Sequence, residues 1–233
     1  AGAGEIGPYS QFFQVTRFTN CLFAGNSAGP ARHGGALVAN DQISIANSTF
    51  TQNVASQGGA VYIGPLVLVS AANSIMWGDS PQEIAFFVPE FASFTATHCA
   101  IEGGWAGKGN LDADPLFMQA AARDFRLTAG SPCVDAGNNF LVPPEVQFDL
   151  GGQPRFVDGD DDKLVVVDMG AHELQDAPAV VGDITHDGQV IVDDLVALLV
   201  AWGACPPPGR GECPADIAPQ PAGDGAVNVD DLV

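Results

Sequence analysis

The sequence predicts an all-β fold, a β-solenoid of stacked parallel strands that ends in a cap and is followed by a small α-helical module. Two observations predict it. Strings of similar residues recur about every 26 residues in the first half, and one ten-residue string recurs near the C-terminus. The composition agrees, because 46% of the 233 residues are hydrophobic and only 15% are charged, which is enough apolar material for a core.

The repeat in the first half is short and strand-like. Its strings NCLF, NSTF, NSIM and HCAI begin at residues 20, 47, 73 and 98, with offsets of 27, 26 and 25. Each unit is too short for two helices and is rich in Val, Ile, Phe, Thr and Gly, which favours short strands separated by turns. A fixed period is typical of units that bury one face against their neighbours, so we expect about four stacked rungs.

Alternation along a strand predicts which side chains point inward, because residues two apart share a face. One inward row is large and apolar: Phe23, Phe50, Met76 and Ile101. A row of small residues lies beside it: Cys21, Ser48, Ser74 and Cys99. A third, mostly apolar row begins at Phe18 and continues with Ile45, Ala71 and Ala96. It lies five positions earlier, so it points inward only if the chain bends between the two rows.

A polar row occupies one stacked position, at Asn26, Asn53 and Asp79. It is either a ligand-binding row or an internal ladder in which side chains bond from rung to rung. We favour the ladder, because the turns of a solenoid must satisfy their backbone groups. His33 and His98 have no partners nearby in the sequence, and we expect them to be solvated rather than catalytic.

The pairs Phe23/Asn26 and Phe50/Asn53, each followed by Gly-Gly-Ala at residues 34–36 and 58–60, resemble the repeat of polymorphic outer-membrane proteins. The resemblance covers residues 18–62. It implies a right-handed parallel β-helix with the pectin-lyase-like fold, in an extracellular or cell-surface setting in bacteria. It implies no activity.

Enzymes of this fold that cleave polysaccharides carry carboxylates on one exposed face, often with calcium and a basic residue. A lyase must neutralise a uronate carboxylate and abstract a proton. Residues 1–100 offer only Arg17 and Arg32 as bases, with five acids that include Asp79 and Glu83. An inverting hydrolase needs only two carboxylates. A fragment of a polysaccharide-degrading lyase or glycoside hydrolase therefore remains the alternative to a non-catalytic protein.

Residues 113–176 lose the period, and we predict that they form a cap over the last rung, which would otherwise be an open edge. The strings DPLF (114–117), DFRL (124–127), GSPCVDAG (130–137) and DMGAHE (168–173) resemble the end region of bacterial β-helix surface proteins. The acids at 158 and 160–162 either bind a cation or form a turn. The predicted boundaries are 1–112 for the rungs, 113–176 for the cap, 177–181 for a linker and 182–233 for the module.

The recurring ten-residue string belongs to a predicted calcium loop. Counted from Asp183, oxygen ligands fall at positions 1, 3, 5, 7 and 12, and Gly188 stands at position 6, where such a loop turns sharply. The predicted ligands of the first loop are Asp183, Thr185, Asp187, the Gln189 carbonyl and Asp194. Residues 224–233 match residues 187–196 at eight of ten positions, although the second loop has four extra residues. Its candidate ligands are Asp216, Asp224, the Ala226 carbonyl, Asn228 and Asp231.

Two calcium loops with helices after a linker resemble a type I dockerin, over residues 182–233. The resemblance implies bound Ca²⁺, with one ion expected in the first loop and a second in the other loop if that loop closes. It also implies a protein partner, a cohesin, bound through the helices. Loop positions 10 and 11, often Ser-Thr in that family, are Val192-Asp193 and Val229-Asp230 here. A cohesin-like partner and self-assembly therefore both stay open.

The cysteines favour an exported protein. Cys205 and Cys213 lie eight positions apart between the two repeats, and we predict a disulfide that contributes about 2–3 kcal/mol. Cys21 and Cys99 stand three rungs apart, about 14 Å at the usual strand spacing, which is beyond disulfide reach. They and Cys133 are predicted to be buried thiols.

The charge excludes several partners. With 28 acidic and 8 basic residues the net charge is −20, which repels nucleic acid and anionic glycans but leaves a neutral polysaccharide open. No apolar run reaches the roughly 18 residues that cross a bilayer. No Met precedes Ala1, no signal peptide is present and the second loop has no helix after it, so we expect an incomplete solenoid and an incomplete module. We thus expect a non-catalytic extracellular or cell-surface protein that attaches or assembles through its C-terminal module.

Overall fold

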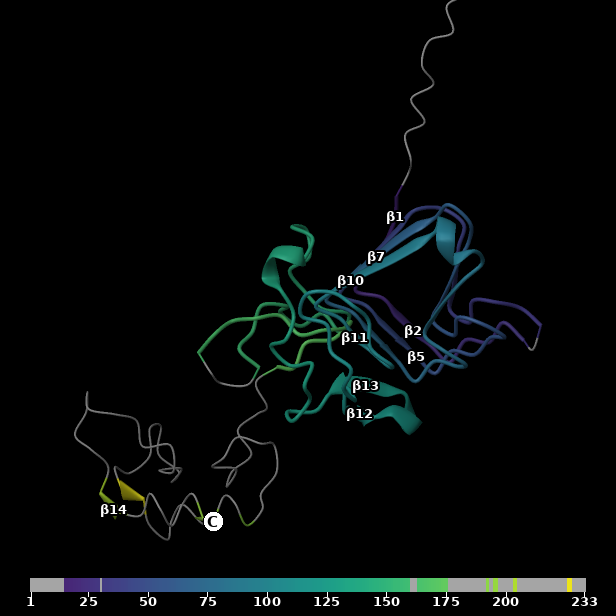
Figure 1. The fold of residues 1–233 in the computed structure, drawn as a ribbon. Helices are drawn as coiled ribbons and strands as arrows, with labels where there is room; N and C mark the ends of the chain where they lie inside the picture. Colours follow the sequence, from purple (N-terminus) through teal and green to yellow (C-terminus); the bar gives the residue numbers. More distant parts are fainter. Residues whose placement is uncertain are drawn as a thin grey trace, which may run out of the picture.

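A computed structural model describes residues 15–29, 31–159 and 163–175, and in addition Val192, Leu195, Val196, residues 203–204 and residues 226–227. The chain winds as a coil of short strands, and equivalent strands of successive turns lie side by side in parallel sheets (Figure 1). Three complete turns are present, followed by the first two strands of a fourth. The predicted all-β solenoid of parallel strands is therefore confirmed.

Three sheets form the sides of the coil. Sheet 1 consists of β1 (Thr16–Thr19), β4 (Ile43–Ala46), β7 (Leu68–Ala72) and β10 (Ser93–Thr97). Sheet 2 consists of β2 (Leu22–Ala24), β5 (Thr49–Thr51), β8 (Ile75–Trp77) and β11 (Ala100–Ile101). Sheet 3 consists of β3 (Leu37–Ala39), β6 (Val61–Ile63) and β9 (Ile84–Phe86), and a short 3-10 turn, η1 (Pro89–Phe91), leads from it to β10.

The interior rows follow the predicted register. Sheet 2 aligns Phe23 with Phe50, Phe50 with Met76 and Met76 with Ile101, and the last three are buried. The rings of Phe23 and Phe50 stack with their centroids 4.5 Å apart. In sheet 1 the third row aligns in the same way: Phe18, Ile45, Ala71 and Ala96. Spacing in the sequence thus predicted the strand register correctly.

A bend between sheets 1 and 2 turns both rows inward, as the alternation required. The residue at the bend has a left-handed backbone in every turn, with φ of 52°, 46°, 46° and 51° at Asn20, Asn47, Asn73 and His98. Asn and His adopt this conformation more readily than most residues. The first residue of each repeated string is therefore the bend.

The repeated Gly-Gly pair is required by the backbone path before sheet 3. Gly58 has a φ of +62°, which favours glycine. Gly59 has no room for a side chain, because a Cβ there would lie 2.4 Å from the backbone nitrogen of Ser80 in the next turn. Gly34 and Gly35 repeat both constraints one turn earlier, with a φ of +70° and a Cβ position 2.4 Å from the Gly59 carbonyl oxygen.

Residues 105–111 cover the last turn of the coil. The Trp105 ring meets the Phe94 ring edge to face at 5.1 Å, and its indole N–H donates to the Phe94 carbonyl at 3.3 Å. The Asn110 amide donates to the Ala96 carbonyl and accepts from the Cys99 backbone N–H. Leu111 pairs with β11, donating to Cys99 and accepting from Ile101. These contacts satisfy the outer edge of the last strand.

Residues 113–175, called the flank segment below, lie against the outer face of sheet 2. The segment begins with the antiparallel pair β12 (Phe117–Gln119) and β13 (Asp124–Leu127), with η2 (Ala120–Ala122) between them, and continues through η3 (Asn139–Leu141). Its apolar contact with the coil joins Leu127, Cys133 and Met169 to Ile75 and Ala100. The predicted domain boundaries stay a prediction, since the contacts along sheet 2 and the cover at residues 105–111 do not test them.

Candidate functional site

The predicted calcium loops lie outside the described residues, apart from Val192 in the first loop and Ala226 and Val227 in the second, and of these three only Ala226 is a predicted ligand. Ala226 and Val227 form β15, which pairs antiparallel with β14 (Gly203–Ala204). Val192, Leu195 and Val196 are helical and exposed. The other predicted ligands and the cysteine pair remain predictions: Asp183, Thr185, Asp187, Gln189, Asp194, Asp216, Asp224, Asn228, Asp231, Cys205 and Cys213.

Within the described part of the chain, no three His, Cys, Asp or Glu side chains are grouped so that they could hold a metal ion. Asp158 belongs to this part, and its carboxylate accepts the Lys163 backbone N–H at 2.8 Å. Asp160, Asp161 and Asp162 lie outside it, so the choice between a cation site and a turn stays open.

The polar row is an internal ladder, as we favoured. Asn53 stands at its centre and is fully buried. Its Oδ1 accepts the backbone N–H of Asn26 at 3.0 Å and the Asn26 amide at 2.8 Å. Its own amide donates to the Phe23 carbonyl at 2.9 Å and to Asp79 Oδ1 at 2.7 Å. The side chains of this row therefore bond from rung to rung, as expected of an internal ladder.

The ladder ends in two buried carboxyl groups, those of Asp79 and Glu83. Asp79 Oδ1 accepts the backbone N–H and the side-chain amide of Asn53, and Glu83 Oε1 accepts the Asp79 backbone N–H at 3.0 Å. Burial is the main cause that raises the pKa of both groups, that of Glu83 to about 10. From the sequence, Glu83 was included only among the five acids of residues 1–100. Its place beside the ladder was not predicted, because Glu83 falls outside the repeated string.

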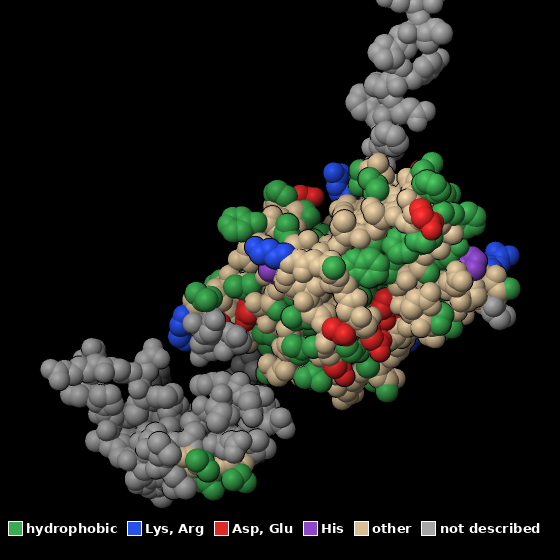
Figure 2. All heavy atoms as spheres, in the orientation of Figure 1, with side chains coloured by type: hydrophobic (Ala, Val, Ile, Leu, Met, Phe, Trp, Pro, Cys, Tyr) green, Lys and Arg blue, Asp and Glu red, His purple; other side chains and the backbone are tan. Residues whose placement is uncertain are grey.

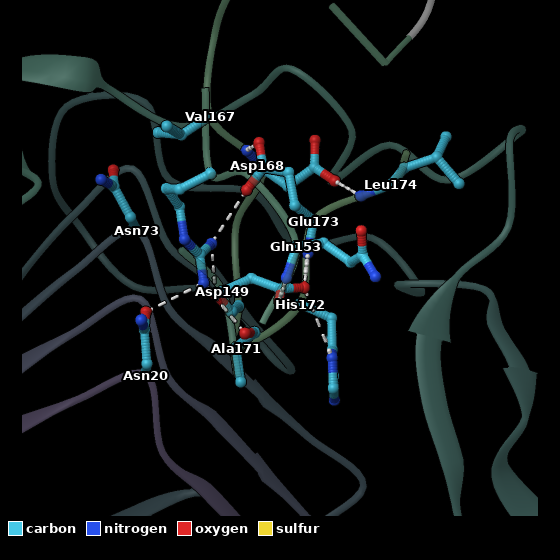
Figure 3. Close-up of polar contacts among 12 residues, drawn as sticks. Asn20, Asn73, Asp149, Gln153, Val167, Asp168, Ala171, His172, Glu173 and Leu174 are labelled. Atoms are coloured by element: carbon cyan, nitrogen blue, oxygen red, sulfur yellow. Dashed lines mark hydrogen bonds and ion pairs between the residues drawn. The ribbon is translucent and has the colours of Figure 1, made fainter. Parts of the chain in front are cut away.

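A second buried polar cluster joins the flank segment to the coil (Figure 3). Its centre is Arg155, which is fully buried. The guanidinium bonds Glu173 Oε2 at 3.0 Å and Asn20 Oδ1 at 2.9 Å, and it donates to the carbonyls of Gly170 and Ala171. One side chain thus holds the chain near residue 170 against the first bend of the coil.

The acids beside Arg155 are held by backbone N–H groups. Asp168 accepts from Asp135 and Leu174, and Glu173 Oε1 accepts from Asp168. Asp149 Oδ2 accepts from the Glu173 backbone and lies 3.7 Å from His172 Nδ1. Burial raises the pKa of Asp168 to about 7 and that of Glu173 to about 9, although Arg155 lowers both. These are the Asp and Glu of the DMGAHE string, so that string encodes attachment.

The histidines and the described thiols have structural surroundings. His33 is exposed and stacks on Tyr62 with centroids 4.4 Å apart. His98 was expected to be solvated, but it is half-buried at the fourth bend and its Nδ1 lies 3.2 Å from the Ala136 carbonyl. Cys21, Cys99 and Cys133 are free thiols, as predicted, with Cys21 half-buried. Burial raises the pKa of the Cys99 thiol to about 11 and that of Cys133 to about 12.

A groove of about 520 Å³ lies over the outer face of sheet 1. Its floor carries outward side chains of all four strands: Arg17, Thr19, Ser44, Ala46, Ser70, Ala72, Thr95 and Thr97. The flank segment supplies one wall: Leu141, Pro143, Pro144 and Glu145. Glu145 is the one carboxylate among the lining residues, whereas hydrolysis with inversion uses two. The lining of the groove therefore lacks the acid pair of an inverting glycosidase.

The charged side chains of the face in Figure 2 are unevenly arranged, with several acids gathered in one area and the basic side chains scattered singly. The basic cluster that a lyase would need is therefore lacking on this face of the described residues. No helix in the described part of the chain is long and apolar enough to cross a membrane.

One comparison with known proteins finds a match, within the second turn of the coil. A sequence model of the Chlamydia polymorphic membrane protein repeat matches residues 47–64. These residues include the bend at Asn47, the ladder residue Asn53, the Gly58-Gly59 pair and strand β6. No curated protein and no solved structure matches the chain.

Proposed function

We propose that the chain is a non-catalytic β-solenoid protein of the bacterial cell surface, whose C-terminal dockerin-like module binds calcium and mediates attachment or assembly. The observation that carries the surface assignment is the matched repeat at residues 47–64, which coincides with the most completely bonded rung of the ladder. We assign the coil to the right-handed pectin-lyase-like β-helices. The ten-residue string that recurs at residues 187–196 and 224–233 supports the module.

Calcium binding is tested on the full chain by isothermal titration and by limited proteolysis with and without a chelator. We expect at least one Ca²⁺ per chain and faster cleavage after chelation, because a loop of negative ligands is stabilised by the ion. The double variant Asp183→Asn/Asp194→Asn should lose the first site. Asp193→Asn is the matched control, because position 11 of the loop supplies no ligand. If titration with Ca²⁺ releases or absorbs no heat and the chelator does not change the rate of cleavage, the calcium claim is wrong.

Attachment is tested by sedimentation velocity with and without Ca²⁺ and by retention on immobilised cohesin domains. Association of the chain with itself that requires Ca²⁺ would indicate assembly, and retention on a cohesin would indicate a cohesin-like partner. If neither depends on the calcium-loop residues, the module does not act in attachment.

Surface location is tested on intact cells that express the chain with a short epitope inserted after Gly130, an exposed turn position with open space around it. We expect antibody labelling of unbroken cells and removal of the label by added protease. A label that is reached only after lysis would contradict the surface assignment.

The second candidate function, degradation of a polysaccharide, is favoured by one observation, the groove on sheet 1. A panel of neutral and uronate-containing polysaccharides is incubated with the full chain, and new reducing or unsaturated ends are measured. We expect none. If new ends are released by the wild type and by Glu90→Gln, which lies outside the groove, but not by Glu145→Gln, the chain is an enzyme. The non-catalytic proposal would then be wrong.

A further inference from the structure

The polar ladder changes chemistry at its last described rung. Asn26 and Asn53 carry amides, which donate and accept at once and can therefore continue a ladder from rung to rung. Asp79 carries a carboxyl group, whose Oδ1 already accepts two N–H groups of Asn53, at 2.6 Å and 2.7 Å. An ionised carboxylate has no proton to donate further, so the ladder needs another group to end it.

That group is Glu83, and one oxygen of each carboxyl lies buried without a partner. Asp79 is 7% exposed and Glu83 is 5% exposed. Glu83 Oε1 accepts the Asp79 backbone N–H, whereas Asp79 Oδ2 and Glu83 Oε2 have no hydrogen-bond partner among the described residues. A buried polar atom without a partner destabilises the fold, and it does so more when it is charged.

Among the described residues, no positive charge stands among the main influences on the pair. The charged group that acts on both Asp79 and Glu83 is Glu102, which is itself acidic and whose Oε2 accepts the Gly78 backbone N–H at 2.8 Å. No group of three metal-binding side chains lies here or elsewhere in the described part. Two carboxylates that are buried together cannot both ionise cheaply, and one proton between them removes the repulsion.

We propose that Asp79 and Glu83 bind one proton between them at neutral pH, and that this proton ends the ladder. One carboxyl then donates an O–H to the other, through the side-chain hydrogen bond that joins the two residues. The turn between β8 and β9 is thus held closed by a proton, and loss of the proton at high pH opens the turn.

The sign of the pH dependence follows from the raised pKa values. The pKa of Glu83 rises from 4.5 to about 10 in the folded chain, mainly through burial, and that of Asp79 is also raised. At pH values between these two pKa values of Glu83, the folded chain keeps a proton that the unfolded chain has released. Stability from the pair is therefore present at low pH and falls as the pH rises.

The experiment compares the wild-type full chain with Asp79→Asn/Glu83→Gln in urea unfolding at pH 6, 7, 8 and 9, with a chelator throughout. The folding constant of the variant relative to wild type should rise by up to ten-fold for each pH unit, because one proton is involved. The cluster around Arg155 titrates equally in both proteins and cancels. A ratio that does not change with pH would overturn the proposal.

Two further measurements keep the test decisive if the double variant folds poorly. The single variant Asp79→Asn places an amide at this position, as in the other rungs. At pH 9 it should be more stable than the wild type. Carbon NMR should show that the Glu83 carboxyl of the wild type is still protonated at pH 7, whereas an ionised signal overturns the proposal. If 10 mM CaCl₂ stabilises the wild type more than Asp79→Asn/Glu83→Gln at pH 8, the pair binds a cation, and the proton assignment fails. The variants retain every predicted loop ligand, so calcium binding at the C-terminus is unaffected.

Discussion

The coil and the flank segment bury polar groups in different ways. In the coil, polar side chains are mostly amides and hydroxyls that repeat with the period, such as Asn26 with Asn53 and Ser48 with Ser74. In the flank segment, charged groups are buried without any period, and Arg155 serves four acceptors in Glu173, Asn20 and two backbone carbonyls. A repeated contact can be satisfied by neutral groups, whereas a contact made once draws on the several donors of a guanidinium.

The two regions should therefore fail differently when a polar side chain is removed. Loss of a ladder amide affects one rung and its neighbours. Loss of Arg155 removes the donor that bonds Glu173 Oε2 and frees the end of the flank segment from the first bend of the coil.

The largest effect is expected for Arg155→Met. Its removal leaves buried acceptors at Gly170, Ala171 and Glu173 without this donor, and each unsatisfied buried group costs about 1–3 kcal/mol of the free energy of unfolding. Urea unfolding measures the loss, and hydrogen exchange should show faster exchange of the Gly170 and Ala171 amides, which bond the coil. If the loss stays below about 1 kcal/mol and these amides remain protected, the flank segment is not held by charge.

The next effect is expected for Asn53→Ala, which removes every side-chain hydrogen bond of the central ladder residue. The Phe23 carbonyl and both N–H groups of Asn26 lose these bonds, whereas Asp79 Oδ1 keeps the backbone N–H of residue 53, and we expect a loss of about 1–3 kcal/mol. Asn40→Ala is the matched control, because Asn40 is exposed. Equal stability of the two variants in urea would show that the ladder adds nothing to the fold.

A smaller effect is expected from Asp168, whose pKa burial raises from 3.8 to about 7. Between these values the folded chain holds a proton that the unfolded chain has lost, so stability falls as the pH rises, by up to about 1.4 kcal/mol per pH unit. Unfolding of wild type and Asp168→Asn at pH 5, 6 and 7 isolates this contribution. Parallel curves for the two proteins would mean that Asp168 is ionised throughout.

The smallest effect is expected for Arg126→Ala on the same flank segment. Arg126 pairs with Asp124 at 2.6 Å, but its side chain is 61% exposed, and pairs of this kind contribute little. Urea unfolding should give the wild-type midpoint within error. A large loss here would mean that exposed charge, and not only buried charge, holds the flank segment.

The period made the coil predictable. Phe23, Phe50, Met76 and Ile101 could be aligned from offsets alone, because in a stack each residue lies beside its counterpart one repeat away. The same logic gave the ladder, in which Asn53 joins Asn26 to Asp79. The sequence predicted that the chain must bend between the two inward rows if both are to face the core. The residues that form the bend were identified only from their left-handed backbone.

The flank contacts could not be predicted in this way. Arg155 bonds Asn20 across 135 positions, and Ala171 bonds Thr49 across 122, and no period links such pairs. Glu83 was missed for a related reason, since it lies four positions after the ladder residue and outside the repeated string. The calcium-loop residues rest on sequence spacing and stay a prediction.

The flank segment also contacts three successive turns of the coil. It bonds Asn20 in the first turn, Thr49 in the second and Asn73 in the third, at residues 155, 171 and 170. Residues 170 and 171 are neighbours, so their partners must be one rung apart. Repeat proteins gain and lose whole units easily because each unit touches only its neighbours. Here a duplicated or deleted rung would displace one of these partners by a strand spacing. The flank segment therefore fixes the spacing of the three turns that it contacts.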